Sequence, residues 1–473
     1  MEQNIWHCPI CGQDFPGDQP PERCPICGAG ASVFTKVGAS AAQQWRCLVC
    51  GQVFEGAEPP VPCPVCGAGR QAFEPQPQEE EPPRQDTDRR FVLIGGGAAG
   101  LECAKAIRRR DKTASITLIC GEKQAPYNRP ALSDALADGL SLAALLLQEP
   151  QWYEEQAIRL LTGVCCTEIL REQKQIRLDN GETLPYDKLL LAVGSQPFLP
   201  LKPQEGAVPL YALRSYEDCR RLTQAAQGAN KAVILGGGIL GVEAALALRE
   251  QGLRVTIAER GPHILTAQAD ENAAALTADW LNRRGISIRC GVTGEALLPE
   301  GLRLNDGSVL EADFVLAAAG VRPQVALAQA CGLATDRGVL TDETMVTSDP
   351  DIYAAGDCAQ FQDRPGGLWS EAAAQGQVAG AQMAGDSQAV YTRPVPAAAL
   401  EENGLSLFSC GLTRGARLQT LTYEDAFSGV YKRLFLEDGK IVGGILFGDT
   451  SQAGQLLNWV ASRRQAPASI LES

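Results

Sequence analysis

The feature that most constrains this chain is a pair of four-cysteine units near its start. Cys8, Cys11, Cys24 and Cys27 recur, each 39 residues later, as Cys47, Cys50, Cys63 and Cys66. Two Cys-x-x-Cys-Gly pairs form each unit, with twelve residues between the pairs. A Cys-x-x-Cys turn directs two sulfurs at one metal, and four thiolates form a tetrahedral site that suits iron or zinc. Because about thirty residues make little core, the metal itself has to hold such a unit together.

The remaining composition favours metal ligation by sulfur alone. The chain has 17 cysteines and only two histidines, His7 and His263. Its start carries no basic or apolar leader, and no apolar stretch reaches the ~18–20 residues of a membrane helix. We therefore expect a cytoplasmic protein, in which paired cysteines bind metal rather than form disulfides. The net charge of −14 argues against binding to nucleic acid or to an anionic membrane.

Aromatic residues frame the cysteines in both units. Trp6, Phe15 and Phe34 recur as Trp45, Phe54 and Phe73. Together with the Gly-x-x-Pro-Pro turn, this frame resembles the short rubredoxin-like module of rubrerythrins. The resemblance implies one iron in each unit, at residues 1–37 (the first cysteine unit) and 45–73 (the second cysteine unit). Zinc ribbons share the cysteines, so zinc stays an alternative.

Residues 74–90 alternate proline with acidic residues and contain no apolar run to bury. Such a segment is expected to be a solvated tether. A tether would hold both cysteine units at high effective concentration over the rest of the chain.

From residue 91 the pattern becomes α/β. The apolar strand at 91–94 runs directly into Gly95-x-Gly97-x-x-Gly100, a helical stretch follows to about Arg110, and a second strand begins at Ile116. Strand, glycine turn, helix and strand form a dinucleotide-binding unit, in which the glycines let a pyrophosphate approach the helix N-terminus. The carboxylate expected at the end of the second strand, where it would bind the ribose, lies two or three residues further on. Glu122 is therefore a weaker candidate for ribose binding.

The same arrangement returns near residue 232. An apolar strand leads into Gly236-x-Gly238-x-x-Gly241, and the strand after the helix ends at Glu259. A carboxylate at that place binds the ribose 2′-hydroxyl and repels a 2′-phosphate, so NADH is favoured over NADPH. Arg260 beside it keeps NADPH as an alternative.

Further segments complete a family resemblance. Strands return to glycine at Gly194 and Gly320, and Gly356-Asp357 ends another strand. This set resembles the two-dinucleotide flavoprotein superfamily of pyridine-nucleotide oxidoreductases. The segment Pro-Tyr-Asn-Arg129-Pro130-x-Leu-Ser and the C-terminal Gly-Gly-Ile-Leu-Phe-Gly-Asp resemble NADH:rubredoxin oxidoreductases and the flavin portion of nitrite reductase large subunits.

The resemblance implies an α/β fold with two Rossmann-like domains and an α+β C-terminal interface domain. FAD would occupy residues 91–205 and 310–390, NADH residues 206–309, and the interface domain residues 391–473. Glu243 would position the nicotinamide, and the helix near Glu371 would aim its positive end at the flavin. The residues implied for FAD are Gly95, Gly97, Gly100, Arg129, Gly356 and Asp357, with Asp357 on the ribityl hydroxyls; those for NADH are Gly236, Gly238, Gly241, Glu243 and Glu259. Further cofactor-binding candidates are Glu122, Pro130, Gly194 and Gly320.

Two departures from the superfamily matter. Many relatives carry lysine after the Leu-Ser pair, where this chain has Asp134. Residues 122–150 also lack cysteine, so the redox disulfide of disulfide reductases is not expected. Cys165 and Cys166 are adjacent and allow a vicinal disulfide, but small buried side chains are the favoured interpretation, as for the other scattered cysteines.

Two hypotheses of function follow. In the first, electrons pass from NADH through FAD to the iron of the cysteine units and on to an acceptor. The acceptor would be a rubredoxin, rubrerythrin or flavodiiron-type protein, or a small oxidant. In the second, the units are zinc-ribbon docking modules on an NADH-dependent flavoprotein reductase or oxidase. A nitrite reductase role for this chain alone is not expected, because no further cysteine cluster follows residue 410. The sequence leaves the oligomeric state open.

Overall fold

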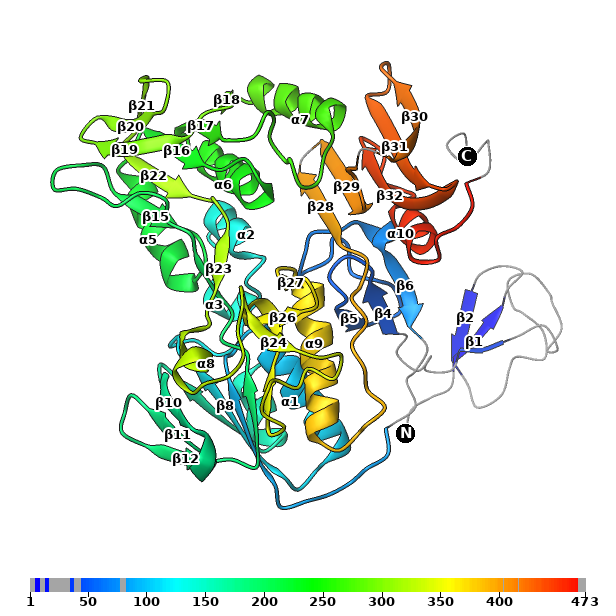
Figure 1. The fold of residues 1–473 in the computed structure, drawn as a ribbon. Coiled ribbons are helices and arrows are strands. Elements are labelled where there is room, and N and C mark those ends of the chain that lie inside the picture. Colours follow the sequence, from blue (N-terminus) through cyan, green and yellow to red (C-terminus); the bar gives the residue numbers. More distant parts are fainter. Residues whose placement is uncertain are drawn as a thin grey trace.

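The computed structural model describes residues 44–76, 82–402, 404–415 and 417–466, and the backbone of residues 5–8, 13–16 and 35–37. Two α/β domains lie side by side, and a C-terminal domain and the second cysteine unit pack together against them (Figure 1). This arrangement confirms the predicted fold class. Within the described residues, no helix is both long and apolar enough to cross a membrane.

The first dinucleotide domain is built on a five-stranded parallel sheet. Helices α1 (Ala98–Arg110) and α9 (Trp369–Met383) pack against each other, because Gly376 and Gly380 let α9 approach the α1 backbone. The strands, in spatial order, are β25 (Ile352–Ala354), β13 (Lys188–Leu191), β7 (Arg90–Ile94), β8 (Ser115–Cys120) and β9 (Ile158–Thr162).

The second dinucleotide domain repeats this plan with a second parallel sheet. Its strands, in spatial order, are β15 (Leu210–Ala212), β22 (Phe314–Ala317), β16 (Lys231–Leu235), β17 (Arg254–Glu259) and β18 (Ile286–Cys290). The predicted return to the first domain at residue 310 is therefore too early. The strand β22 lies between β15 and β16 in the second sheet, where all four of its residues are buried.

Small sheets and helices connect and cover these two domains. The helices are α2 (Leu132–Asp138), α3 (Leu142–Leu145), α4 (Pro150–Glu155), α5 (Tyr216–Gln227), α6 (Ile239–Glu250), α7 (Glu271–Arg283) and α8 (Ala326–Ala330), with short 3-10 turns η3 (Arg171–Gln173) and η4 (Gly356–Cys358). The small sheets are β10 (Cys166–Leu170), β11 (Gln175–Leu178) and β12 (Thr183–Pro185); β14 (Ser195–Pro197) and β23 (Val321–Pro323); β19 (Gly294–Leu298), β20 (Gly301–Leu304) and β21 (Val309–Glu311); and β24 (Val339–Thr341), β26 (Ala359–Phe361) and β27 (Arg364–Pro365).

The C-terminal domain is an antiparallel sheet covered by one helix, α10 (Ala453–Ala461). Both faces of this sheet are buried, since Leu434 and Leu446 pack toward α10 and the second cysteine unit, whereas the neighbouring Phe435 and Ile445 pack toward the second dinucleotide domain. Its strands, in spatial order, are β28 (Ala397–Glu402), β29 (Leu405–Gly411), β32 (Lys440–Phe447), β31 (Val430–Glu437) and β30 (Gln419–Asp425).

Both cysteine units share one backbone plan. In the second unit, β4 (Gln44–Cys47) lies between β5 (Val53–Glu55) and β6 (Phe73–Gln76), with the turn η2 (Arg70–Ala72) before β6. The first unit places β1 (Ile5–Cys8) between β2 (Gln13–Pro16) and β3 (Thr35–Val37). The register also matches, since Trp6 pairs with Phe15 as Trp45 pairs with Phe54.

The segment expected to be a free tether is shorter than the sequence indicates. Residues 74–76 continue β6, where Pro75 pairs with Trp45; a proline is tolerated because β6 is an edge strand. Residues 85–87 are also held on the body: the amide of Gln85 donates to Arg110, and Thr87 donates its hydroxyl to Asp111 at 2.6 Å.

Candidate functional site

The four cysteines of the second unit converge on one point. Their sulfurs all lie within 4.8 Å of one another, with Cys47–Cys66 at 3.6 Å and Cys50–Cys63 at 3.7 Å. These separations are far longer than a disulfide bond. They match a tetrahedron with metal–sulfur bonds of about 2.3 Å, whose edges measure about 3.8 Å. The donor set therefore fits a four-thiolate metal site.

Backbone turns and aromatic rings hold this site in shape. The amide of Gly51 donates to Cys47, and that of Gly67 to Cys63, which closes both knuckles in the same way. The Trp45 indole donates to the carbonyl of Gly56 at 3.1 Å, while Phe54 and Phe73 pack edge to face at 6.0 Å. In the first unit Cys11, Cys24 and Cys27 lie outside the described residues, and only the backbone of Cys8 is described.

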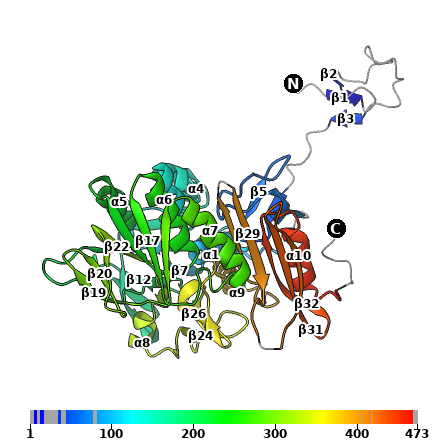
Figure 2. The ribbon, with the colours of Figure 1, turned by 90° about the horizontal axis from the view of Figure 1, so that it is seen from above.

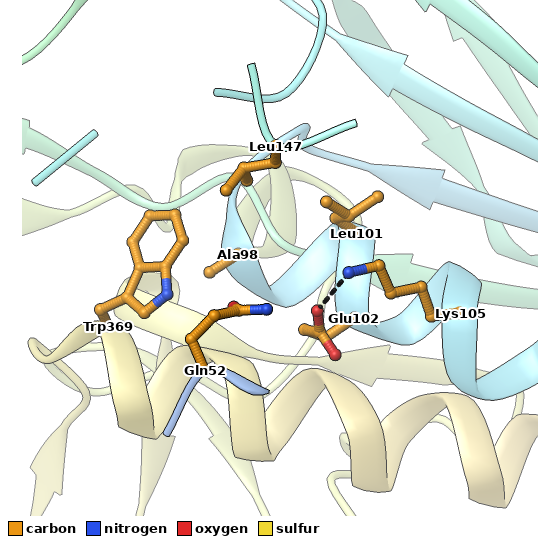
Figure 3. Close-up of a pocket in the computed structure, with 7 residues that line it drawn as sticks. All are labelled: Gln52, Ala98, Leu101, Glu102, Lys105, Leu147 and Trp369. Carbon is orange, nitrogen blue, oxygen red and sulfur yellow. Dashed lines mark hydrogen bonds and ion pairs between the residues drawn. The ribbon is translucent and has the colours of Figure 1, made fainter. Parts of the chain in front are cut away.

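The second cysteine unit contacts the first dinucleotide domain through both knuckles. The amide Nδ2 of Asn128 donates to the carbonyl of Pro64, between two of the ligands, at 2.7 Å. On the other knuckle, Gln52 lines a small pocket with Trp369, at the start of α9, and Leu147 (Figure 3). The Trp369 indole nitrogen is buried there and has no hydrogen-bond partner within the described residues.

The first glycine turn offers an open helix N-terminus. Gly95 has φ of +122°, and a Cβ there would lie 2.0 Å from the carbonyl oxygen of Ala192, so only glycine fits. Gly100 packs equally closely on the carbonyl of Gly95. In contrast, a Cβ on Gly97 would meet nothing within 4 Å in the described part of the chain. The N-terminal amides of α1 therefore face open space, which fits the pyrophosphate of FAD.

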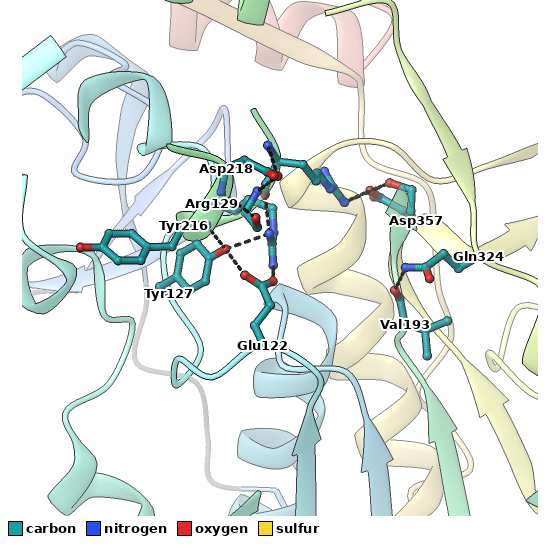
Figure 4. Close-up of polar contacts among 11 residues, drawn as sticks. Glu122, Tyr127, Arg129, Val193, Tyr216, Asp218, Gln324 and Asp357 are labelled. Atoms are coloured by element: carbon teal, nitrogen blue, oxygen red, sulfur yellow. Dashed lines mark hydrogen bonds and ion pairs between the residues drawn. The ribbon is translucent and has the colours of Figure 1, made fainter. Parts of the chain in front are cut away.

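Arg129 is held in a half-buried polar network near this turn (Figure 4). Its guanidinium contacts the Glu122 carboxylate at 2.7 Å and the Tyr127 hydroxyl at 2.9 Å, and the same hydroxyl donates to Glu122 at 2.6 Å. Burial raises the pKa of Tyr127, which keeps the hydroxyl protonated. Glu122 thus orients Arg129, and Pro130 follows directly before α2.

Asp357 lies in a second network, which joins the first because Arg129 donates to the carbonyl of Arg214. Its carboxylate accepts from the Ser195 hydroxyl at 2.7 Å and from Arg214 at 2.8 Å. Gly356 donates its amide to Gln375 of α9, which ties this turn to the helix. Gly194, one residue before Ser195, and Gly320 both have positive φ, at the turns that follow β13 and β22.

The second glycine turn has the same geometry as the first. A Cβ on Gly236 would lie 2.4 Å from the carbonyl oxygen of Ala318, whereas one on Gly238 would meet nothing within 4 Å among the described residues. The Glu259 carboxylate closes this turn by accepting from the amides of Gly237 and Gly261 at 2.6 and 2.5 Å. Gly241 packs on the Gly236 carbonyl at the start of α6.

Glu243 lies on α6 where the two dinucleotide domains meet. It accepts a hydrogen bond from Ser133 of α2 at 2.9 Å. Burial, reinforced by the nearby Asp134 and Glu402, raises the pKa of Glu243 to about 8, so the carboxyl is mostly protonated at neutral pH. Burial together with Asp134 also raises the pKa of Glu402 to about 7.

The structure therefore places the glycines of both motifs at strand-to-helix turns, and it links Glu122, Arg129 and Asp357 through Arg214. It also adds residues that the sequence did not single out, namely Arg214, Ser195 and Trp369. No local pattern marks Arg214 or Ser195, since each contributes through a partner more than a hundred positions away. The cysteines from Cys103 onward are free thiols, including the adjacent pair Cys165 and Cys166. The expected burial of that pair is wrong, because Cys165 is exposed and Cys166 is only partly buried.

Three family models match the chain. The model described as pyridine nucleotide-disulphide oxidoreductase matches residues 89–376. That of the rubredoxin NAD+ reductase C-terminal domain matches residues 396–464. The rubredoxin-like domain of rubrerythrin matches twice, at residues 6–35 and 45–74, which confirms the resemblance drawn from both cysteine units.

Characterised proteins resemble most of the chain. It is 33% identical over 383 residues to an assimilatory nitrate reductase electron transfer subunit of Bacillus subtilis, covering 80% of this chain and 50% of that protein. It is 32% identical over 378 residues to the NADH-rubredoxin oxidoreductase of Clostridium acetobutylicum, covering 79% of this chain and 95% of the relative. The chain thus spans about half the length of the first relative and nearly all of the second.

The fold agrees with a solved structure of the same kind. The crystal structure of NADH:rubredoxin oxidoreductase from Clostridium acetobutylicum superposes with a TM-score of 0.68 at 30% identity. The match covers 82% of this chain and 98% of that one.

Proposed function

This chain belongs to the pyridine nucleotide-disulphide oxidoreductase family, and from that membership we propose that it is an FAD-dependent NADH oxidoreductase. Its electrons pass to its own four-cysteine units and then to an acceptor outside the chain. The relatives named for rubredoxin reduction support this direction of transfer. In this protein the rubredoxin-like acceptor is part of the same polypeptide.

One observation carries the proposal: the metal site lies against the turn that precedes Arg129. The hydrogen bond from Asn128 to Pro64 joins a metal knuckle to the segment expected to hold FAD. Gln52, beside Cys50 and Gly51, reaches the start of α9 at Trp369. A redox unit in this position is suited to accept electrons over a short path.

The chain's own residues bind and align the two dinucleotides. Gly95, Gly97 and Gly100 leave room for the FAD pyrophosphate at α1, and Arg129 and Asp357 add a cation and a hydrogen-bond acceptor around it. Gly236, Gly238, Gly241 and Glu259 provide the matching site for NADH at α6. Glu243, mostly protonated at neutral pH, positions the nicotinamide as a neutral group. Bound FAD supplies the conversion between the two-electron chemistry of nicotinamide and the one-electron chemistry of a four-thiolate iron site.

We propose iron in both cysteine units, because the aromatic frame of the second unit is that of rubredoxin-like domains. A rubredoxin, rubrerythrin or flavodiiron-type protein, or a small oxidant, is the proposed acceptor. The free thiols throughout the body favour work in the reducing cytoplasm.

Metal and flavin analysis tests this function. Purified protein is expected to contain FAD and about two irons, and anaerobic NADH should bleach the visible absorption of the iron. The second unit's match to a rubredoxin-like domain predicts that NADH reduces it without any added protein. Two zincs and no iron, or iron that NADH leaves oxidised, would refute the proposal.

A further inference from the structure

We propose that the C-terminal domain and Asn128 form a permanent seat that holds the second cysteine unit in one electron-accepting position. Gly454 and Asn128 are its positioning residues. The inference rests on the proposed function, since a seat matters for electron transfer only if the unit carries electrons. It replaces the expected mobile tether with a fixed internal partner.

The first argument is a shared hydrophobic core. Buried residues of the second unit and of the C-terminal domain form one continuous cluster. Figures 1 and 2 both show the second unit, in blue, next to the C-terminal domain, in orange and red, and η2 of the unit contacts α10 of the domain. The unit contributes Cys47, Val49, Cys50, Cys63, Val65, Ala68, Ala72 and Phe73, and the domain contributes residues that include Phe408, Leu434, Leu456, Leu457, Trp459 and Val460.

A core of this kind is not a loose encounter surface. Three of the metal ligands, Cys47, Cys50 and Cys63, are 0, 3 and 2% exposed because this cluster and the first dinucleotide domain surround them. Separating the unit would return a set of large apolar side chains to water, at about 25 cal/mol per Å². The associated state is therefore strongly favoured within one chain.

Polar contacts fix the orientation of the unit on both sides. On the C-terminal side, Gln71 donates to the Thr450 hydroxyl at 3.1 Å, and that hydroxyl donates to Glu401 at 3.0 Å. On the opposite side, Asn128, only 7% exposed, donates to Pro64 at 2.7 Å. Hydrogen bonds to two different domains prevent the unit from rotating about either one.

The backbones of the unit and of α10 approach closely at Gly454, near the start of the helix. A Cβ there would lie 2.6 Å from the carbonyl oxygen of Gln71 and 3.2 Å from the Leu48 side chain. The α10 backbone itself is helical at this position, and alanine favours a helix more than glycine does. A methyl group at Gly454 thus leaves α10 intact and pushes the unit away.

Gly454→Ala tests the seat in the full-length holoprotein. A C24S/C27S background leaves only the second unit with its four cysteines, so the visible absorption comes from one iron site and the flavin. After rapid anaerobic mixing with NADH, the variant should bleach this iron at least tenfold more slowly. Flavin bleaching by NADH should stay within twofold, because Gly454 lies in the C-terminal domain. Amide hydrogen exchange across residues 44–76 should rise in the same variant.

Two further variants guard the interpretation. Asn128→Ala removes the opposite contact and should also slow iron reduction and raise exchange in the unit. Glu58→Ala removes an exposed ion pair with Arg70 within the unit and should change neither reading. If Gly454→Ala and Asn128→Ala both leave the iron rate and the exchange unchanged, the seat is refuted. If the native protein holds zinc, the proposed function fails, and the exchange alone decides whether the seat exists.

Lengthening the linker distinguishes a unit held in the seat from one that is held by its linker alone. Inserting ten glycine and serine residues between Gln78 and Glu79 should leave the iron rate within twofold, because the seated fraction stays near one. A unit that is only tethered would lose effective concentration, and its rate would fall about threefold, because the linker between β6 and Gln85 would grow from eight to eighteen residues. A fall of that size would overturn the proposal.

Discussion

The Ser133 hydroxyl donates to a carboxyl oxygen of Glu243 at 2.9 Å, across the junction of the two dinucleotide domains. Asp134, next to Ser133, and Glu402, from the C-terminal domain, both help to raise the pKa of Glu243. Three domains thus bring acidic groups together where the nicotinamide is expected to bind. Neighbouring negative charges disfavour ionisation of a carboxyl, so this cluster favours the protonated form of Glu243.

Glu243→Gln should change how stability depends on pH. The pKa of Glu243 is about 8 in the folded chain and near its ordinary value when unfolded, so the folded state binds the extra proton. Stability is then full below about pH 4.5 and falls as pH rises toward 8. The neutral amide should match the native protein at pH 5 and exceed it at pH 8 by about 1–3 kcal/mol. Thermal unfolding across this range provides the measurement, and equal slopes in both proteins would contradict the assignment.

Asp134→Lys should reverse the local charge. An ammonium group in place of Asp134 removes one cause of the raised pKa values of Glu243 and Glu402. Because Asp134 is exposed, we expect a modest gain of about 1 kcal/mol at pH 8. The flavin potential should rise, because a positive charge favours the reduced form. Potentiometric titration checks this, with Asp134→Asn as the neutral intermediate; a potential that does not follow the order Asp, Asn, Lys would exclude Asp134 from flavin tuning.

Glu259→Ala should weaken the preference for NADH. The carboxylate now accepts from the Gly237 and Gly261 amides and would repel a 2′-phosphate. Its loss should raise the KM for NADH about tenfold or more and bring it closer to the KM for NADPH. Steady-state assays with ferricyanide as acceptor measure both values. Glu295→Ala, an exposed carboxylate of the same domain, is the matched control, and an unchanged coenzyme ratio in Glu259→Ala would remove Glu259 from the ribose site.

Cys63→Ser should remove one metal and destabilise more than the unit that holds it. Cys63 is a buried ligand inside the core shared with the C-terminal domain, so loss of the metal loosens both. We expect metal content to fall by about one ion per chain and the thermal midpoint to drop by several degrees. Cys165→Ser changes an exposed free thiol and should do neither. A Cys63→Ser protein with native metal content would disprove the four-sulfur site.

The parts of the fold that the sequence predicts are those with local signals. Phe91–Ile94 and Ala232–Leu235 are apolar runs that end directly in glycine, and both form the expected strand and turn. The cysteine spacing likewise predicts the sulfur cluster, because each knuckle is a contact between near neighbours. These features need no knowledge of distant residues.

The features that the sequence misses depend on distant pairing. The strand β22 is apolar enough for either sheet, and only its pairing with β15 and β16 assigns it to the second domain. Pro75 suggests a linker, yet an edge strand accommodates it. The contact of Gln71 with Thr450 joins residues 379 positions apart, and neither side chain is unusual for a protein surface.

The contact at Gly454 distinguishes the two copies of the duplicated unit. A shift of 39 residues aligns Leu48 with Pro9 and Gln71 with Ser32, so the positions that meet α10 have diverged. The metal-binding cysteines at equivalent positions are identical in both copies. The two units therefore share their metal-binding cysteines but differ at the two positions that contact α10 in the second unit. If the two units exchanged places along the chain, Pro9 and Ser32 would stand where Leu48 and Gln71 now contact α10.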